Sequence, residues 1–248
     1  MAYSAPKGVI TSTVINTDDT QAHAGVIWCD QGATNTAPTI AVAATTGDIA
    51  ATSDGSTACT DFFEAGGTAG TIDVSDANAN TFGEVVDIIN QAGGWHMKLT
   101  GAIRSEASTV AQLVTRAATK CMGIENATPL FFDTSAVDHY RVAVSAAPLD
   151  EMGYINEVLS VQACCTCSGT PYLWVLEVPE IVKPPVIPTT TDYKVLWKYL
   201  LTSTTAVDFD ETEIHIESSP GHRLIVSMSG SSDISSAYLV VRHRTKPV

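Results

Sequence analysis

The sequence predicts a mainly β fold with two short helices (α+β), arranged as an antiparallel β-sandwich or barrel-like sheets with a small C-terminal β unit. Hydrophobic residues make up 45% of the 248 positions, which is enough to build a core. Charged residues make up 16%, below the roughly 25% of a typical soluble domain. The chain also contains 31 threonines, whose branched Cβ favours strands.

The first 80 residues are rich in threonine, alanine and glycine and contain short apolar runs. Turn signals at 17–19 and 53–55 separate these runs. The pattern predicts strands at 9–15, 25–29, 39–44 and 70–74.

The clearest local pattern is a helix over 81–93. Thr81 and Glu84 have the spacing of a capping box. Apolar residues then recur on one helical face, and two glycines stop the helix. Trp95, Met97 and Leu99 follow in alternation with polar residues, which predicts a strand with one buried face.

A second helix is predicted over 108–122, because apolar residues recur there at helical spacing and Gly123 follows them. The stripe consists of Val110, Leu113, Val114, Ala117 and Cys121.

Beyond it, in 157–168, the odd positions from 159 to 167 are apolar and most of the even positions are polar, which predicts a long strand. A turn at 169–171 leads to a hairpin partner at 172–178.

Composition divides the chain into three parts. We expect a main β-rich domain over 1–180, a proline- and threonine-rich linker over 181–191, and a small β domain or arm over 192–248. The last part carries strand patterns at 193–201, 213–217, 223–228 and 237–242. It could fold alone or pair with neighbouring chains.

The net charge of −14 argues against binding nucleic acid or anionic membranes. The basic group Arg242, His243, Arg244 and Lys246 suggests a solvated tail, or else a tail that docks on an acidic partner. The N-terminus lacks a secretion signal, and no apolar run reaches the ~20 residues of a membrane helix. We therefore expect synthesis in a host cytoplasm.

The six cysteines are expected to be free, buried thiols. Cys164, Cys165 and Cys167 contain a C-x-x-C, but no second pair supplies the other ligands that zinc needs. On a strand, Cys165 and Cys167 share one face and Cys164 points the other way. Packing is therefore favoured over a metal or redox role.

Three other patterns resemble known kinds of site. Asp76–Asp87 places oxygen ligands as a calcium loop does, but position six is Thr81 where glycine is needed, so entry into a helix is favoured. Residues 66–70 are glycine-rich without the lysine of a phosphate loop and predict a turn. Asp208, Asp210 and Glu211 could form an acid/base pair, although acidic turns are commoner.

The four tryptophans lie in apolar strand patterns, where packing is the default and a glycan platform the alternative. They are Trp28, Trp95, Trp174 and Trp197. No catalytic, cofactor-binding or metal-binding residue is assigned, and the chain is not expected to be an enzyme or to need a cofactor.

One segment resembles a small αβ element that recurs in structural proteins of tailed-bacteriophage virions. The likeness covers 52–102, and its centre is the turn Asn90-Gln-Ala-Gly-Gly-Trp95 between the helix and a strand. The segment also contains a hairpin turn at Ser53-Asp-Gly55 and the stretches 70–74 and 97–102. The resemblance implies membership of a virion or tail and brings no catalytic residues.

We therefore expect a capsid decoration or cement protein on the outer surface of a phage head. No long N-terminal spine helix of a shell-forming protein is predicted, which favours this accessory role. The expected partners are the major capsid protein or other virion subunits, and the expected assembly is a homotrimer. The alternative is a tail or host-recognition module that binds surface glycans, with tyrosine or tryptophan exposed on a loop face.

Overall fold

A computed structural model gives the fold as mainly β, with open antiparallel sheets and no closed barrel in the part of the chain that it describes. The chain divides into two compact units, one of residues 1–22 with 138–248 and one of residues 23–137. The described residues are 10–16, 21–32, 34–43, 46–108, 113–133, 140–144, 154–167, 169, 171–179, 193–202, 206–229 and 234–248.

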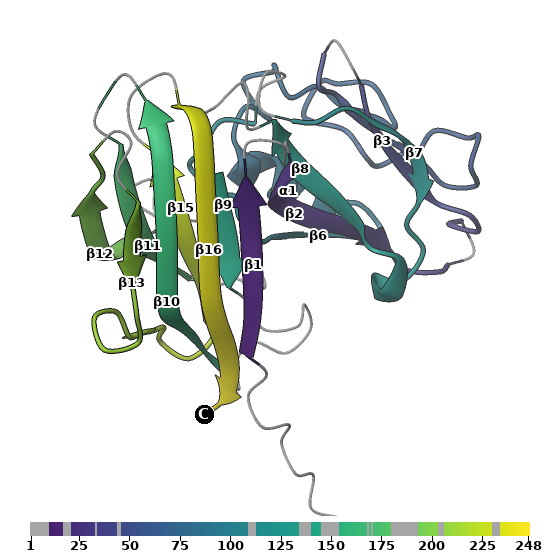
Figure 1. The fold of residues 1–248 in the computed structure, drawn as a ribbon. Helices are drawn as coiled ribbons and strands as arrows, with labels where there is room; N and C mark the ends of the chain where they lie inside the picture. Colours follow the sequence, from purple (N-terminus) through teal and green to yellow (C-terminus); the bar gives the residue numbers. More distant parts are fainter. Residues whose placement is uncertain are drawn as a thin grey trace, which may run out of the picture. The chain divides into compact units, whose positions relative to one another are not determined.

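The first unit is a sandwich of two sheets (Figure 1). One sheet has the order β1-β16-β10-β13, with β14 also on β10: β1 Ile10–Asn16, β16 Ile234–Pro247, β10 Tyr154–Cys167, β13 Val207–Phe209 and β14 Ile216–Glu217. The other has the order β12-β11-β15-β9: β12 Lys194–Leu200, β11 Tyr172–Pro179, β15 His222–Ser229 and β9 Tyr140–Val144.

The two sheets bury one shared apolar core. Val161 of β10 and Leu239 of β16 come from one sheet, and Leu173 of β11 and Val226 of β15 come from the other. All four side chains are fully buried. Burial of facing side chains is the main force that holds two such layers together.

A bulge in β10 changes which residues face the core. The pairing of β10 with β16 shifts register between Val158 and Ser160. Beyond the bulge the predicted alternation holds, because Val161 and Ala163 are buried and Gln162 is exposed. Before it, Val158 belongs to the core instead. One extra residue in a strand has this effect, and it leaves Glu157 on the opposite face from Val158.

The second unit contains two smaller sheets. One has the order β6-β2-β8: β6 Trp95–Leu99, β2 Gln21–Cys29 and β8 Thr128–Asp133. The other has the order β5-β4-β3-β7: β5 Thr71–Ile72, β4 Ile49–Thr52, β3 Thr39–Val42 and β7 Arg116–Lys120. A 3-10 turn, η2, covers Ile124–Asn126.

The α-helix α1 spans Phe82–Gln91 and confirms the first predicted helix. The Thr81 hydroxyl accepts a hydrogen bond from the Glu84 amide at 3.3 Å, and the Glu84 carboxylate accepts one from the Thr81 amide at 3.0 Å. The Asn90 side chain then bonds both the amide and the carbonyl of Met97, at 2.8 and 3.1 Å. These bonds tie the helix end to β6, where Trp95 is fully buried.

The second predicted helix is wrong. Residues 116–120 form β7, which pairs antiparallel with β3, and 109–112 lie outside the described residues. Of the predicted stripe, Leu113 and Cys121 are buried but Ala117 is exposed. The β-branched Thr115 and Thr119 favour a strand, and the edge of β3 supplies its backbone partners.

The compact units do not follow the predicted domain boundaries. The predicted linker 181–191 lies outside the described residues. Strands of the predicted C-terminal part complete both sheets of the first unit, because β12 and β15 pair with β11, and β16 pairs with β10. That 192–248 folds alone or pairs with a neighbouring chain stays a prediction. Within the described residues, no helix is both long and apolar enough to cross a membrane.

Candidate functional site

The main candidate site is the outer edge of β12. This strand ends its sheet (Figure 1), and no strand among the described residues pairs with its other side. Seven large apolar side chains of the described residues are more than a third exposed, and four of them lie on or beside β12: Tyr193, Val195, Tyr199 and Leu200. An exposed apolar sheet edge is a surface on which other chains can bind.

The backbone of β12 offers hydrogen bonds along this edge. The Leu201 amide donates to the Pro171 carbonyl at 2.9 Å, so the backbone groups of Leu201 point towards the chain of β11. Backbone groups alternate in direction along an antiparallel pair. The amides and carbonyls of Lys198 and Leu200 therefore point away from β11, where a further strand could bond them.

Three aromatic rings close this end of the sandwich. Trp197 and Tyr199 of β12 stack with centroids 6.0 Å apart, and the Phe209 ring of β13 meets them edge-on at 5.0 and 4.9 Å. The rings thus connect the last strand of one sheet to the last strand of the other. We call Trp197, Tyr199 and Phe209 the aromatic end; Tyr199 is 39% exposed.

Opposite charges flank the aromatic end. On the β12 side, Lys194 and Lys198 are exposed. The Lys198 ammonium lies 3.7 Å from the ring centre of Tyr172 and 4.2 Å from that of Trp174. On the β13 side lie four exposed acidic residues: Asp208, Asp210, Glu211 and Glu213.

The acidic residues that could form an acid/base pair instead shape a turn. The Asp210 carboxylate accepts hydrogen bonds from the hydroxyl and the amide of Thr212, at 2.6 and 2.8 Å, and these bonds lower the pKa of Asp210. Asp208 accepts one from the Gln162 amide group at 3.0 Å. A lowered pKa keeps Asp210 ionised, which is unsuited to a general acid.

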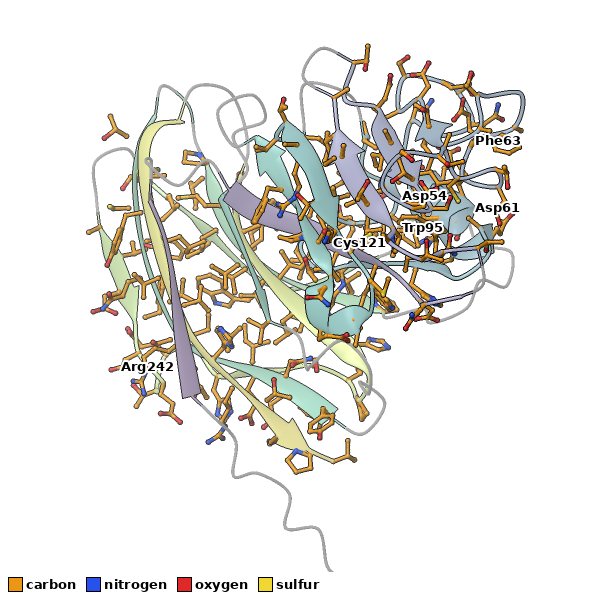
Figure 2. The ribbon with its side chains drawn as sticks, turned by 90° about the vertical axis from the view of Figure 1, so that its right-hand side faces the viewer. Asp54, Asp61, Phe63, Trp95, Cys121 and Arg242 are labelled. Atoms are coloured by element: carbon orange, nitrogen blue, oxygen red, sulfur yellow. The ribbon has the colours of Figure 1, made fainter. Side chains whose placement is uncertain are left out.

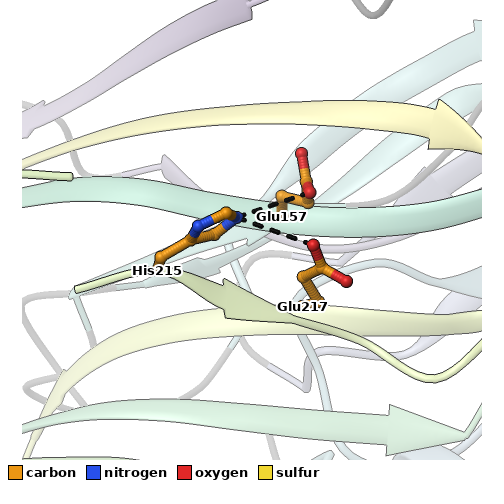
Figure 3. Close-up of side chains that lie close together, drawn as sticks. All are labelled: Glu157, His215 and Glu217. Carbon is orange, nitrogen blue, oxygen red and sulfur yellow. Dashed lines mark hydrogen bonds and ion pairs between the residues drawn. The ribbon is translucent and has the colours of Figure 1, made fainter. Parts of the chain in front are cut away.

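A second cluster surrounds Glu157, whose side chain is fully buried. Arg244 Nε and Lys246 Nζ both donate to it, the latter at 2.5 Å. Lys246 also binds Glu217 at 2.7 Å. The His215 ring nitrogen lies 3.5 Å from Glu157 and 3.6 Å from Glu217 (Figure 3). Sequence reasoning missed this cluster, because its members are far apart in the chain.

Glu157, His215 and Glu217 place one ligand atom each within 4.8 Å of one another, as a metal site would. The protein's own cations already fill this position, because Lys246 bonds both carboxylates and Arg244 bonds one. Burial acts to raise the pKa of Glu157, but the hydrogen bonds from Arg244 and Lys246 outweigh it and hold the pKa at about 2. The cluster is an ion-pair network that joins β10, β14 and β16.

The same cluster corrects the prediction for the basic C-terminus. Residues 242–246 are part of β16, not a solvated tail. Arg244 and Lys246 bind Glu157, and burial lowers the pKa of His243. Arg242 is exposed (Figure 2).

The cysteines have different surroundings. Cys165 lies in the sandwich core and Cys164 is half-buried on the other face, as strand alternation predicts, while the side chain of Cys167 lies outside the described residues. Burial raises the pKa of Cys29 and of Cys121 to about 12. Such thiols are poor nucleophiles and poor metal ligands.

Cys59 belongs to a hydrogen-bond chain in the second unit that runs from the buried Trp95 to the exposed Asp61. The Trp95 indole donates to its sulfur at 3.1 Å, and the thiol donates to Asp61 at 3.1 Å. Asp61 also accepts from the Gly93 amide at 2.6 Å; Figure 2 shows Asp61 and Trp95 close together. This chain positions the turn before β6, which is a structural role.

The calcium-like and glycine-rich patterns serve local structure. Asp87 bonds Arg104 at 2.5 Å, and the Asp76 carboxylate accepts from the Asn78 amide at 2.8 Å within the loop that enters α1. Gly66 and Gly70 adopt φ of 88° and 82°, typical of glycine turns.

Among the tryptophans, Trp95 is core, and the other three are partly buried. Trp28 stacks on His96 at 5.2 Å, and His96 bonds Asp30 at 2.8 Å.

Comparisons with known proteins do not identify a family. No protein-family model matches the chain, and no curated protein matches its sequence. Two solved structures of infectious bursal disease virus align with it weakly. One, of the T13 viral particle, has a TM-score of 0.15 and 11% identity over 97% of this chain and 59% of that chain. The other, of the Gt strain, has a TM-score of 0.16 and 10% identity, and the alignment covers 98% of this chain and 73% of that chain. Values this low carry no inference about fold or function.

Proposed function

We propose that this chain is a structural protein of a virus particle that acts by binding other protein subunits and not by catalysis. The observation that carries the proposal is the concentration of exposed apolar side chains on β12, at the open edge of an otherwise well-packed sandwich. A protein that works alone in water would be expected to protect such an edge.

The composition supports the same role. Charged residues are few, at 16%, although the net charge reaches −14. Protein surfaces that neighbours cover are poor in charge. In its most specific form the proposal is a decoration or cement protein on a phage capsid surface, bound to the major capsid protein or other virion subunits, with many modest contacts that add by multivalency. The resemblance of 52–102 to phage virion elements supports this form.

The test compares particles made with and without the gene for this chain, by negative-stain microscopy and by resistance to heat. We expect bound copies on the particle and a lower disruption temperature without them. A Val195→Glu/Leu200→Glu variant, which charges the β12 edge, should bind at least tenfold less. The matched control is Phe63→Glu, because Phe63 is a similarly exposed apolar residue of the other unit, at 37%. Particles that form, package and resist heat equally without the chain would refute the role.

A second function, glycan binding by a tail or host-recognition module, is favoured by one arrangement. Trp28, His96 and Asp30 place flat rings beside an exposed carboxylate, and sugars bind such combinations of stacking and hydrogen bonding. A glycan array with the full chain tests it. Binding that Trp28→Ala abolishes would support this function, and an array without signal would exclude it.

A further inference from the structure

We propose that Asp54 and Gly55 form a site of spontaneous covalent modification, at which Asp54 converts to isoaspartate, and that Ser56 and Thr57 suppress this conversion in the folded chain. The site lies in the second unit, in the turn that follows β4, and all four residues are exposed to water. Figure 2 labels Asp54. The inference goes beyond the proposed function and does not rest on it.

An aspartate that precedes a glycine can close into a five-membered ring, because glycine has no side chain to shield its backbone nitrogen. The nitrogen of Gly55 would attack Cγ of Asp54. A bond forms between these two atoms, the bond from Cγ to its hydroxyl oxygen breaks, and this hydroxyl leaves with the amide proton as water. A second water then opens the ring at the main-chain carbonyl, so that the backbone runs through the side-chain carbonyl and gains one carbon. The conversion consumes no oxidant, cofactor or enzyme.

The turn itself requires this pair of residues. Gly55 adopts a φ of 90°, in the left-handed region that favours glycine. The Asp54 carboxylate stabilises the turn, because its Oδ1 accepts hydrogen bonds from the amides of Ser56 at 2.9 Å and Thr57 at 2.6 Å. The sequence has no other aspartate before a glycine and no asparagine before one. In the unfolded chain, ring closure is therefore expected first at Asp54.

Two features of the folded turn oppose ring closure. The reactive form is the neutral carboxyl group, since an ionised carboxylate has no hydroxyl that can leave. The hydroxyl of Ser56 donates to Oδ1 of Asp54 at 3.0 Å, and that of Thr57 donates to Oδ2 at 2.8 Å. Together with the amide bonds, of which that from Thr57 has the largest effect, they hold the pKa of Asp54 well below its usual range. The Gly55 amide is also held, because it donates to the Thr52 hydroxyl at 3.2 Å.

Conversion would disturb the hairpin that this turn closes. The Ser53 amide donates to the Thr57 carbonyl at 2.9 Å, and the Cys59 amide donates to the carbonyl of Ala51 in β4 at 3.1 Å. One extra backbone carbon at position 54 changes the spacing between these partners. The hydroxyls of Ser56 and Thr57 therefore protect the covalent structure of the turn as well as its fold.

The experiment incubates the full chain at mildly acidic pH, both folded and unfolded in guanidinium chloride, and measures isoaspartate at each aspartate by peptide mapping. The double variant Ser56→Ala/Thr57→Val removes both hydroxyls. Thr57→Ser keeps a hydroxyl at position 57. Circular dichroism verifies that each variant is folded before incubation.

Ser75→Ala is the matched control in another turn. The amide and hydroxyl of Ser75 donate to Oδ1 of Asp73 at 2.8 and 2.5 Å, as those of Ser56 do for Asp54. Asp73, however, precedes Val74, whose side chain shields the backbone nitrogen.

In the unfolded chain we expect isoaspartate at Asp54 before any other aspartate. In the folded wild type the rate at Asp54 should be lower by about tenfold or more, because each unit by which a pKa falls lowers the neutral fraction about tenfold. The double variant should raise the folded rate about threefold or more and leave the unfolded rate unchanged. Thr57→Ser and Ser75→Ala should change the rate at Asp54 by less than about twofold.

Equal rates at Asp54 in the folded and unfolded wild type would overturn the inference, and this comparison needs no variant to fold. So would a folded double variant that converts no faster than the wild type, or faster conversion at another aspartate of the unfolded chain.

Discussion

Glu157 of β10 and Arg244 of β16 face each other directly across an antiparallel strand pair, and Arg244 Nε donates to the Glu157 carboxylate. The bulge after Val158 makes this pairing possible, because it leaves Glu157 on the face opposite the sandwich core. Lys246 joins the same carboxylate at 2.5 Å. One buried acid thereby holds two cations of the last strand.

Removing that acid should destabilise the protein. Glu157→Gln leaves Arg244 and Lys246 without their shared counter-ion. Breaking a buried ion pair costs several kcal/mol, but both cations are 33% exposed, so screening reduces the expected loss to about 2 kcal/mol. Urea unfolding measures it. Glu217→Gln is the control. Glu217 is 45% exposed, so this substitution should lower the free energy of unfolding by no more than about 0.5 kcal/mol. Equal losses of unfolding free energy in the two variants would contradict the role of Glu157 as the shared counter-ion of Arg244 and Lys246.

The same pair predicts a pH dependence. The pKa of Glu157 is lowered from 4.5 to about 2, so its carboxylate stabilises the fold above pH 4.5, and this contribution is lost as the pH falls from 4.5 towards 2. The difference in unfolding free energy between wild type and Glu157→Gln should therefore be constant above that window and shrink within it. A difference that grows on acidification would have the wrong sign for a lowered pKa.

The helix cap predicts a local effect. Thr81→Ala removes the hydroxyl that accepts from the Glu84 amide, which should cost about 1 kcal/mol of unfolding free energy. Thr81→Ser keeps the hydroxyl and should lose much less. The exposed Thr60→Ala is a control for threonine loss outside a cap. Thermal unfolding of the three variants checks the order; a Thr81→Ser variant as unstable as Thr81→Ala would show that the cap is not the cause.

Thiol reactivity should follow burial. Because burial raises the pKa of Cys29 and of Cys121 to about 12, neither is expected to react with iodoacetamide in the native protein. The half-buried Cys164 should be alkylated first among the cysteines whose side chains the structure describes. Peptide mapping by mass spectrometry after timed alkylation gives the order. Modification of Cys29 as fast as Cys164 would mean that the second unit opens readily.

The helix and strands that depend on local pattern were predictable. The capping box at Thr81 and the alternation from Trp95 to Leu99 each involve residues only a few positions apart. Local hydrogen bonds and side-chain spacing therefore determine the backbone there. The second helix failed because weak apolar spacing around Ala117 competed with an available edge on β3, which the sequence does not reveal. Tertiary pairing overrode the local signal.

The candidate sites depended on distant pairing and were harder to predict. Glu157 and Arg244 are separated by 87 positions, and the bulge that aligns them has no local signal. The strand predicted at 193–201 corresponds to β12, Lys194–Leu200, but its place at the edge follows from the order β12-β11-β15-β9. The exposure of its apolar residues could therefore not be predicted from the strand pattern alone.

The most direct test is an electron cryomicroscopy map of the native particle that contains this chain. We expect that, in each copy, protein density from another subunit covers the β12 edge from Tyr193 to Leu200, either a second copy or a shell protein. A map in which this edge faces solvent in every copy would contradict the claim that it is a protein contact.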